Sequence, residues 1–376
     1  MKKFFILFSF YILVSLSAAQ TAVMDFSGWK PDDKNVLKID QKWEFYWNNL
    51  LTPADFKNDS TNLIQPDTLL IPGSWGDLKI KNKSISNIGY ATYRIKLNSL
   101  PDEELTLDIY SVQTSFRVFL NGKLAGEVGT IGTDKESTTP MNRDIQLRIP
   151  SGAKDVEMIV QVANFHHRKG GFVHAFEIGK SRAVIRHRMV YYFLDIAESS
   201  ALAIIGLFLF CLYIFRKKDA PVLYFALFCI TLSFRPVISV NYLASSVFYG
   251  INWSMMLKTE YLAVFFPCLF IVLFIKNLFP HQMPNWFVKI NSAIFILKIL
   301  IVLCCPPSIF SWLTLPLQVF VPLGVVMIAI TILRAMLAKV EGSTYAGIGM
   351  VILLISMVLK IMTYSGILGP MDVTIT

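Results

Sequence analysis

The C-terminal half of the chain holds six long apolar runs, separated by short polar joints, between residues 193 and 370. A bilayer-spanning helix needs roughly 20 predominantly apolar residues, and each run is close to that length. In lipid every backbone polar group must be hydrogen-bonded within its own segment, so the runs are predicted to be helices. The predicted spans are 193–215, 222–243, 257–275, 288–305, 313–333 and 345–367.

The composition agrees with a chain that is partly a membrane protein. Of its 376 residues 54% are hydrophobic, which excludes an ordinary soluble domain. The net charge is +9, but lysine and arginine are scattered, so anionic lipid headgroups rather than nucleic acid are the expected partner. All five cysteines lie in or at the ends of the apolar runs, and no Cys/His spacing fits a zinc motif. We therefore expect no disulfide in the polar half, no metal site and no cofactor.

The first 19 residues have the pattern of a secretory signal peptide. Lys2 and Lys3 precede an apolar stretch at 4–16, and small residues at 17–19 predict cleavage before Gln20. An uncleaved membrane anchor is the alternative. Either reading exports the segment that follows.

Residues 20–179 have the texture of an antiparallel β domain. Trp43, Phe45 and Trp47 alternate along 42–51 and fall on one face of a strand. Asn121-Gly122 between two short β-rich runs predicts a hairpin with a type I′ turn. Further strands are predicted at 91–97, 105–110, 116–120, 145–149 and 156–162. At least seven short strands without a helical period indicate a sandwich or jelly roll, an all-β fold.

The basic segment 180–192 is expected to join the sandwich to the helical bundle of 193–376. Two interpretations remain open: a helical extension of the first span, which would couple the domains stiffly, or a solvated linker at the headgroups. With the N-terminal domain exported, we expect a multi-pass membrane protein whose sandwich lies in the periplasm or outside the cell. Basic residues in the predicted inner loops agree with the positive-inside tendency. Six spans return the C-terminus outside, so we expect the chain to stop before a seventh.

Four blocks of the β-rich half resemble one bacterial family, the seven-transmembrane receptors with diverse intracellular signalling modules (7TMR-DISM). The first is Trp43-Glu44-Phe45-Tyr46-Trp47 with Pro53 and Asp55-Phe56. The others are Pro72-Gly73-Ser74-Trp75 with 89–94, Asn121-Gly122-Lys123 with Gly129 and Gly132, and 164–167 with Gly170-Gly171. These blocks are also similar to the galactose-binding-like jelly roll that precedes some glycoside hydrolases.

The resemblance implies a sensor whose exported domain binds a small ligand, with carbohydrate as the candidate class. The helices would then act on a cytoplasmic kinase, cyclase or phosphatase module. The seventh span and that module are missing from this sequence, so the resemblance implies a C-terminally truncated receptor. A transporter or channel with an accessory sugar-binding domain is the alternative function, and a membrane-anchored binding module is a third.

A ligand site on the sandwich is predicted from side chains that stack on sugar rings or donate oriented hydrogen bonds. The candidates are Trp75, Tyr93, Arg94, Asn164, His166, His167 and Arg168. The alternative makes Trp75 and Tyr93 core residues and the histidines part of a solvated loop. A metal at His166, His167 and His174 has little support, since the spacing fits no zinc motif.

Charged residues within the predicted spans form a second candidate site. Asp195 and Glu198 lie three apart, hence on one helix face, near the outer end of span one. The full set is Asp195, Glu198, Arg235, Lys258, Glu260, Lys298 and Lys360. Charges at membrane depth are costly and face partners or water, so we expect Arg235 to pair with Asp195 or Glu198. Snorkelling or a purely structural ion pair is the alternative.

Motifs of catalysis are lacking in the sequence. It has no phosphate-binding P-loop, no GxSxG elbow and no HExxH zinc motif. Neighbouring carboxylates at Asp102, Glu103 and Glu104 suit a turn between strands better than sugar hydrolysis. We therefore expect a protein that is not an enzyme.

Overall fold

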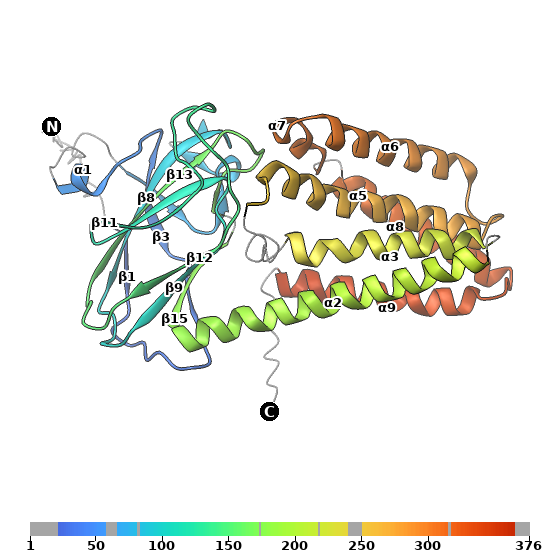
Figure 1. The fold of residues 1–376 in the computed structure, drawn as a ribbon, viewed down its shortest axis with the longest axis horizontal. Helices are drawn as coiled ribbons and strands as arrows, with labels where there is room; N and C mark the ends of the chain where they lie inside the picture. Colours follow the sequence, from blue (N-terminus) through green and yellow to red (C-terminus); the bar gives the residue numbers. More distant parts are fainter. Residues whose placement is uncertain are drawn as a thin grey trace, which may run out of the picture. The chain divides into compact units, whose positions relative to one another are not determined.

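The computed structural model describes residues 22–57, 66–80, 83–172, 174–216, 219–239, 250–314 and 317–364. The chain divides into two compact units (Figure 1). The first comprises Met1–Thr139, Ile145–Asn164 and Lys169–Val184, and the second comprises Pro140–Asp144, Phe165–Arg168 and Ile185–Thr376. The predicted signal peptide, 1–19, lies outside the described residues.

The first unit is built on two sheets. The seven-stranded sheet has the order β11 (Lys123–Val128), β10 (Ser115–Leu120), β13 (Val156–Asn164), β8 (Gly89–Asn98), β3 (Lys42–Trp47) and β4 (Asp67–Leu70), with β1 (Val23–Asp25) parallel to β8. The four-stranded sheet has the order β12 (Ile145–Ile149), β9 (Leu105–Ile109), β15 (Phe176–Lys180) and β2 (Leu37–Ile39). Two-stranded pairs join β14 (Gly171–Phe172) to β5 (Gly73–Ser74) and β6 (Lys79–Ile80) to β7 (Lys83–Ser84). Short helices are α1 (Pro53–Lys57) and η2 (Trp75–Asp77).

Both sheets contribute to one hydrophobic core. Trp43 and Phe45 of β3, Leu107 of β9 and Ile178 of β15 are all completely buried in a single cluster. Alternating residues therefore face inward, as the sequence pattern predicts. A shared core between two sheets is a sandwich, so the predicted all-β architecture is confirmed.

The predicted hairpin is also confirmed. Asn121 and Gly122 have φ angles of 47° and 80° between the antiparallel strands β10 and β11. Positive φ at both central residues is the requirement of a type I′ turn.

The second unit consists mainly of helices. They are α2 (Ser181–Phe215), whose first turn belongs to the first unit, then α3 (Ala220–Ser239), α5 (Trp253–Leu278), α6 (Asn285–Cys304), α7 (Pro307–Phe310), η3 (Ser311–Thr314), α8 (Leu317–Leu337) and α9 (Ser343–Tyr364). Among the described residues five helices are long and apolar enough to cross a membrane: α2, α3, α5, α6 and α8. The sixth predicted span coincides with α9, and its crossing of the membrane stays a prediction.

Helix α2 begins earlier than the predicted first span. It runs unbroken from Ser181, so most of the predicted linker 180–192 is helical. Its first turn belongs to the sandwich, where Ala183 and Val184 are buried and the Ser181 and Thr106 hydroxyls lie 2.7 Å apart. Of the two interpretations of this segment, the helical extension is the one the structure contains.

Candidate functional site

Two of the seven residues predicted to contact a ligand are core residues. Trp75 of η2 and Tyr93 of β8 are 0% and 1% exposed. The indole N–H of Trp75 donates a hydrogen bond to the Tyr93 hydroxyl, and burial raises the pKa of that hydroxyl. Neither side chain offers a surface to a ligand, so the alternative of a packing role is correct for both.

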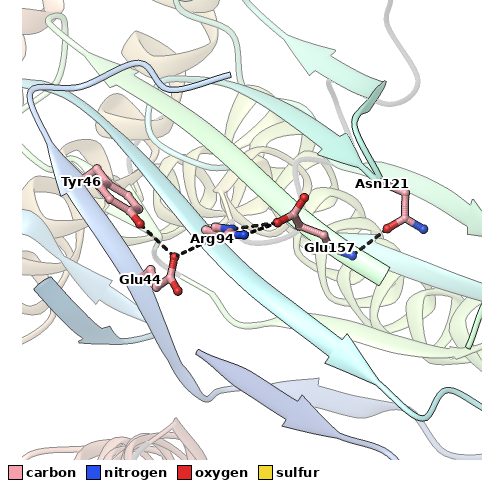
Figure 2. A network of polar contacts seen from close by, with 5 residues as sticks. All are labelled: Glu44, Tyr46, Arg94, Asn121 and Glu157. Carbon is pink, nitrogen blue, oxygen red and sulfur yellow. Dashed lines mark hydrogen bonds and ion pairs between the residues drawn. The ribbon is translucent and has the colours of Figure 1, made fainter. Parts of the chain in front are cut away.

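Arg94 occupies the opposite face of β8, where it forms the centre of a polar network (Figure 2). Its Nε and Nη2 donate hydrogen bonds to one oxygen of Glu157 on β13, and the Nε–Oε1 distance is 2.8 Å. Its Nη1 donates to Glu44 of β3 at 3.2 Å, and the Tyr46 hydroxyl donates to the same Glu44 oxygen at 3.0 Å. The network thus ties three neighbouring strands together across the sheet.

The remaining surface of Arg94 is also largely covered. The Phe56 ring of α1 lies over the guanidinium, with 4.5 Å between Cζ and the ring centroid. The side chain is 17% exposed. Burial works to lower the pKa of Arg94, but the hydrogen bonds and charges of Glu157 and Glu44 outweigh it and raise the pKa. Arg94 therefore stabilises the sheet, and its fork is occupied by protein carboxylates.

Asn164 at the end of β13 is completely buried and holds the backbone around Trp75. Its Nδ2 donates to the Asn87 carbonyl at 2.7 Å and to the Lys169 carbonyl at 3.0 Å. The Asn87 side-chain oxygen in turn accepts hydrogen bonds from Ser74 Oγ and the Gly76 amide. Sequence reasoning missed Asn87, because its partners lie 11 to 83 residues away along the chain.

The other three predicted ligand residues lie in the segment Phe165–Arg168, which belongs to the second unit. The His167 side chain is buried, with Nε2 3.4 Å from the Tyr261 hydroxyl of α5. The Arg168 amide donates to Ser311 Oγ of η3 at 3.3 Å, and the Tyr261 hydroxyl donates to the Ser311 carbonyl at 3.2 Å. These contacts anchor the segment on helical residues that the sequence did not single out.

The seven predicted residues have different surroundings in the structure. Two lie in the core, Arg94 lies on the outer face of the large sheet, Asn164 braces a turn, and His166, His167 and Arg168 lie in the second unit. The binding role of Arg94 and of the segment 165–168 stays a prediction.

His174 is half-buried between β14 and β15, with its ring 5.7 Å from the Tyr110 ring. Burial lowers the pKa of His174, and the nearby Glu177 carboxylate opposes this shift in part. Among the described residues no group of three or more His, Cys, Asp or Glu side chains is placed to hold a metal ion.

This burial predicts a pH dependence of stability. The unfolded chain binds the His174 proton more readily than the folded chain, so stability is complete above about pH 6.5 and falls as the pH drops below it. We expect His174→Asn to reduce this loss between pH 7 and pH 5, measured by thermal unfolding of the full chain. His281→Asn, at an exposed histidine, is the control and should keep the wild-type pH profile. An unchanged profile in His174→Asn would contradict the assignment.

In the helical unit, the polar residues of α2, α3 and α5 have different surroundings. Asp195 is half-buried and Glu198 is exposed. Arg235 of α3 is close enough to Glu260 of α5 for its charge to act on that carboxyl group. The expected pairing of Arg235 with Asp195 or Glu198 stays a prediction, and the Lys360 side chain lies outside the described residues.

Lys258 and Arg188 have structural roles in the second unit. The Lys258 ammonium donates to the Leu303 carbonyl at 2.9 Å, which satisfies one of the free carbonyls at the end of α6. Arg188 of α2 donates to Asp144 at 3.1 Å, and both side chains are nearly buried, at 11% and 2% exposed. Arg188 lies in the basic segment 180–192, next to the exported domain, where the positive-inside tendency predicts few basic residues. Its ion pair with Asp144 gives it a structural role.

Lys298 of α6 is the most unusual charged residue of the helical unit. It is 5% exposed, and its Nζ has no hydrogen-bond partner among the described residues. Three phenylalanine rings surround Nζ at 5.3 to 5.5 Å: Phe265 of α5, Phe295 of α6 and Phe320 of α8. A cation–π contact contributes about 0.5–2 kcal/mol. Burying an ion costs several kcal/mol, so the rings offset only part of that cost.

Comparison with known proteins identifies the helical part. Residues 191–376 match the family model described as "7TM diverse intracellular signalling". The helical part of the chain belongs to this family. The 7TMR-DISM resemblance read from the sequence is thereby confirmed for residues 191–376, and this match together with the apolar helices indicates a multi-pass membrane protein. Among curated proteins, none matches this chain in sequence.

Solved structures that align with part of this chain include three glycosidases. A Bacteroides fragilis protein assigned as a β-galactosidase is 18% identical over 38% of this chain and 23% of its own, with a TM-score of 0.29. A β-glucuronidase of an uncultured Clostridium species is 15% identical over 41% and 30%, with a TM-score of 0.30. The Ruminococcus gnavus β-glucuronidase is 14% identical over 40% and 30%, with a TM-score of 0.29. The aligned part spans less than a third of each of these proteins, and the likeness carries no argument about ligand or activity.

Proposed function

We propose that this 7TMR-DISM protein is the sensing part of a receptor of the bacterial inner membrane. The exported β-sandwich would bind a small molecule, with carbohydrate as the first class to test. The helices would carry the change to a cytoplasmic kinase, cyclase or phosphatase. The family match of residues 191–376 supports the receptor role in general.

The observation that carries the mechanism is the unbroken helix α2. Its first turn is packed within the sandwich through Ala183 and Val184, and its remainder belongs to the helical unit. A continuous helix is stiff, so a displacement of its first turn moves its later turns as well. A ligand shifts such a system only by the difference in its affinity for two states, so binding must favour one position of that turn.

The test measures hydrogen exchange of the full chain in nanodiscs, with and without members of a panel of mono- and disaccharides. We expect one sugar to protect peptides of the sandwich and, in the same experiment, to change exchange at the ends of α3 and α5. A Gly-Gly insertion after Ile185 breaks α2 beyond its first turn. It should keep the protection of the sandwich and abolish the response of the helices.

Each failure identifies an alternative. If a sugar protects the sandwich but leaves the wild-type helices unchanged, the chain is a binding module on a passive anchor. If the Gly-Gly variant responds like the wild type, α2 does not carry the signal. If no sugar acts on the sandwich, carbohydrate is the wrong ligand class.

A further inference from the structure

Among the described residues, α6 carries three side chains with a buried polar atom that has no hydrogen-bond partner: Asn291, Ser292 and Lys298. Lys298 is 5% exposed and Asn291 is 8% exposed, and neither the Lys298 ammonium nor the Asn291 amide nitrogen has a partner among the described residues. They lie seven residues apart on one face, with the Phe295 ring between them. Seven residues correspond to about 10 Å along a helix. Unpaired polar groups are costly inside an apolar bundle.

The described carboxylates of the helical unit do not supply the missing acceptor. The Lys298 ammonium has neither a hydrogen-bond partner nor an ion-pair partner among the described residues. Within the described part of the chain, the ammonium therefore has ring faces around it and no counter-charge.

From these observations we propose that the interior of the helical unit binds a carboxylate with an apolar body, and that Lys298 receives its anionic group. The carboxylate supplies both the counter-charge and hydrogen-bond acceptors. Phe265, Phe295 and Phe320, contributed by α5, α6 and α8, surround the charged end with apolar surface that suits an acyl chain or an aromatic ring. The inference is independent of any ligand of the sandwich.

The test is thermal unfolding of the full chain in nanodiscs of uncharged phosphatidylcholine. The probes are decanoate, decanol and decyltrimethylammonium, which share an apolar chain and differ in the charge of the head group. We expect decanoate to raise the unfolding midpoint by several degrees and the other two to leave it unchanged. A further probe, phenylpropionate, stays in water, whereas decanoate partitions into the bilayer. Comparing the two distinguishes a ligand that arrives from water from one that arrives from the bilayer. Stabilisation by either probe supports the carboxylate site.

Two variants locate the effect. Lys298→Met should abolish the decanoate shift, whereas Lys289→Met, at an exposed lysine of the same helix, should retain it. A shift that persists in Lys298→Met would overturn the assignment of the site. Equal effects of decanoate and decanol on the wild type would overturn the proposal, and this comparison holds even if Lys298→Met fails to fold. If decanoate and decanol act equally, the role of Lys298 is only structural, through its contacts with the rings of α5, α6 and α8.

Discussion

Replacing Arg94 by methionine is expected to destabilise the β-sandwich by about 3 kcal/mol. The change leaves the Glu44 side chain, which is 4% exposed, buried without its counter-charge. It also removes both hydrogen bonds to Glu157 and the contact with the Phe56 ring. Breaking a buried ion pair from one side is costly because the remaining charge stays desolvated. Hydrogen exchange of peptides from β3, β8 and β13 in the full chain measures the loss.

Arg117→Met is the matched control, on strand β10, which pairs with β13 in the same sheet. Arg117 pairs with Glu127, but both side chains are 32% exposed, and such surface pairs contribute about 0–1 kcal/mol. The double variant Arg94→Met/Glu44→Met removes the stranded charge and should recover part of the stability. If Arg94→Met costs no more than Arg117→Met, Arg94 is not a structural residue, and its role as a ligand contact returns.

The strands that the sequence predicts are those with long, regular alternation. The ranges 91–97 and 156–162 match β8 and β13 to within a few residues, because both strands pack one face on the core. The two-residue strands β5, β6, β7 and β14 are too short to show a period, and they form only because tertiary contacts bring them together. The five helices that are long and apolar enough to cross a membrane are likewise predicted by apolar length. For the early start of α2 the sequence leaves two interpretations open, because its first turns are basic.

The candidate sites were harder to predict because side-chain roles depend on distant partners. Arginine is a residue type that often contacts ligands. Only the pairing of β3, β8 and β13 shows that the Arg94 guanidinium is already bound by Glu44 and Glu157. In the helices, the sequence identifies Lys298 as a deep charge. The three rings around it come from three helices, and their meeting depends on helix packing that hydropathy does not encode.

Trp75→Ala is expected to destabilise the sandwich by about 3–5 kcal/mol, the range for removing a large buried aromatic side chain. Trp75 is completely buried against Trp47, with the ring centroids 4.9 Å apart, and its indole N–H satisfies the Tyr93 hydroxyl. Collapse of the surrounding chain cannot refill the space easily, because Gly170 and Gly171 already bring the backbone against the indole. Hydrogen exchange of β8 and β13 peptides measures the effect.

Two comparisons separate this packing role from a ligand contact. Leu70→Ala removes an apolar side chain that is 61% exposed in the same unit, and it should change stability by less than about 0.5 kcal/mol. Trp75→Phe keeps most of the apolar volume but leaves the Tyr93 hydroxyl without its donor, so its cost should lie between the other two. A Trp75→Ala protein as stable as Leu70→Ala would contradict the core assignment and restore Trp75 as a candidate for stacking on a ligand. The graded order arises because stability at this position depends first on filled volume and second on the hydrogen bond that the buried hydroxyl requires.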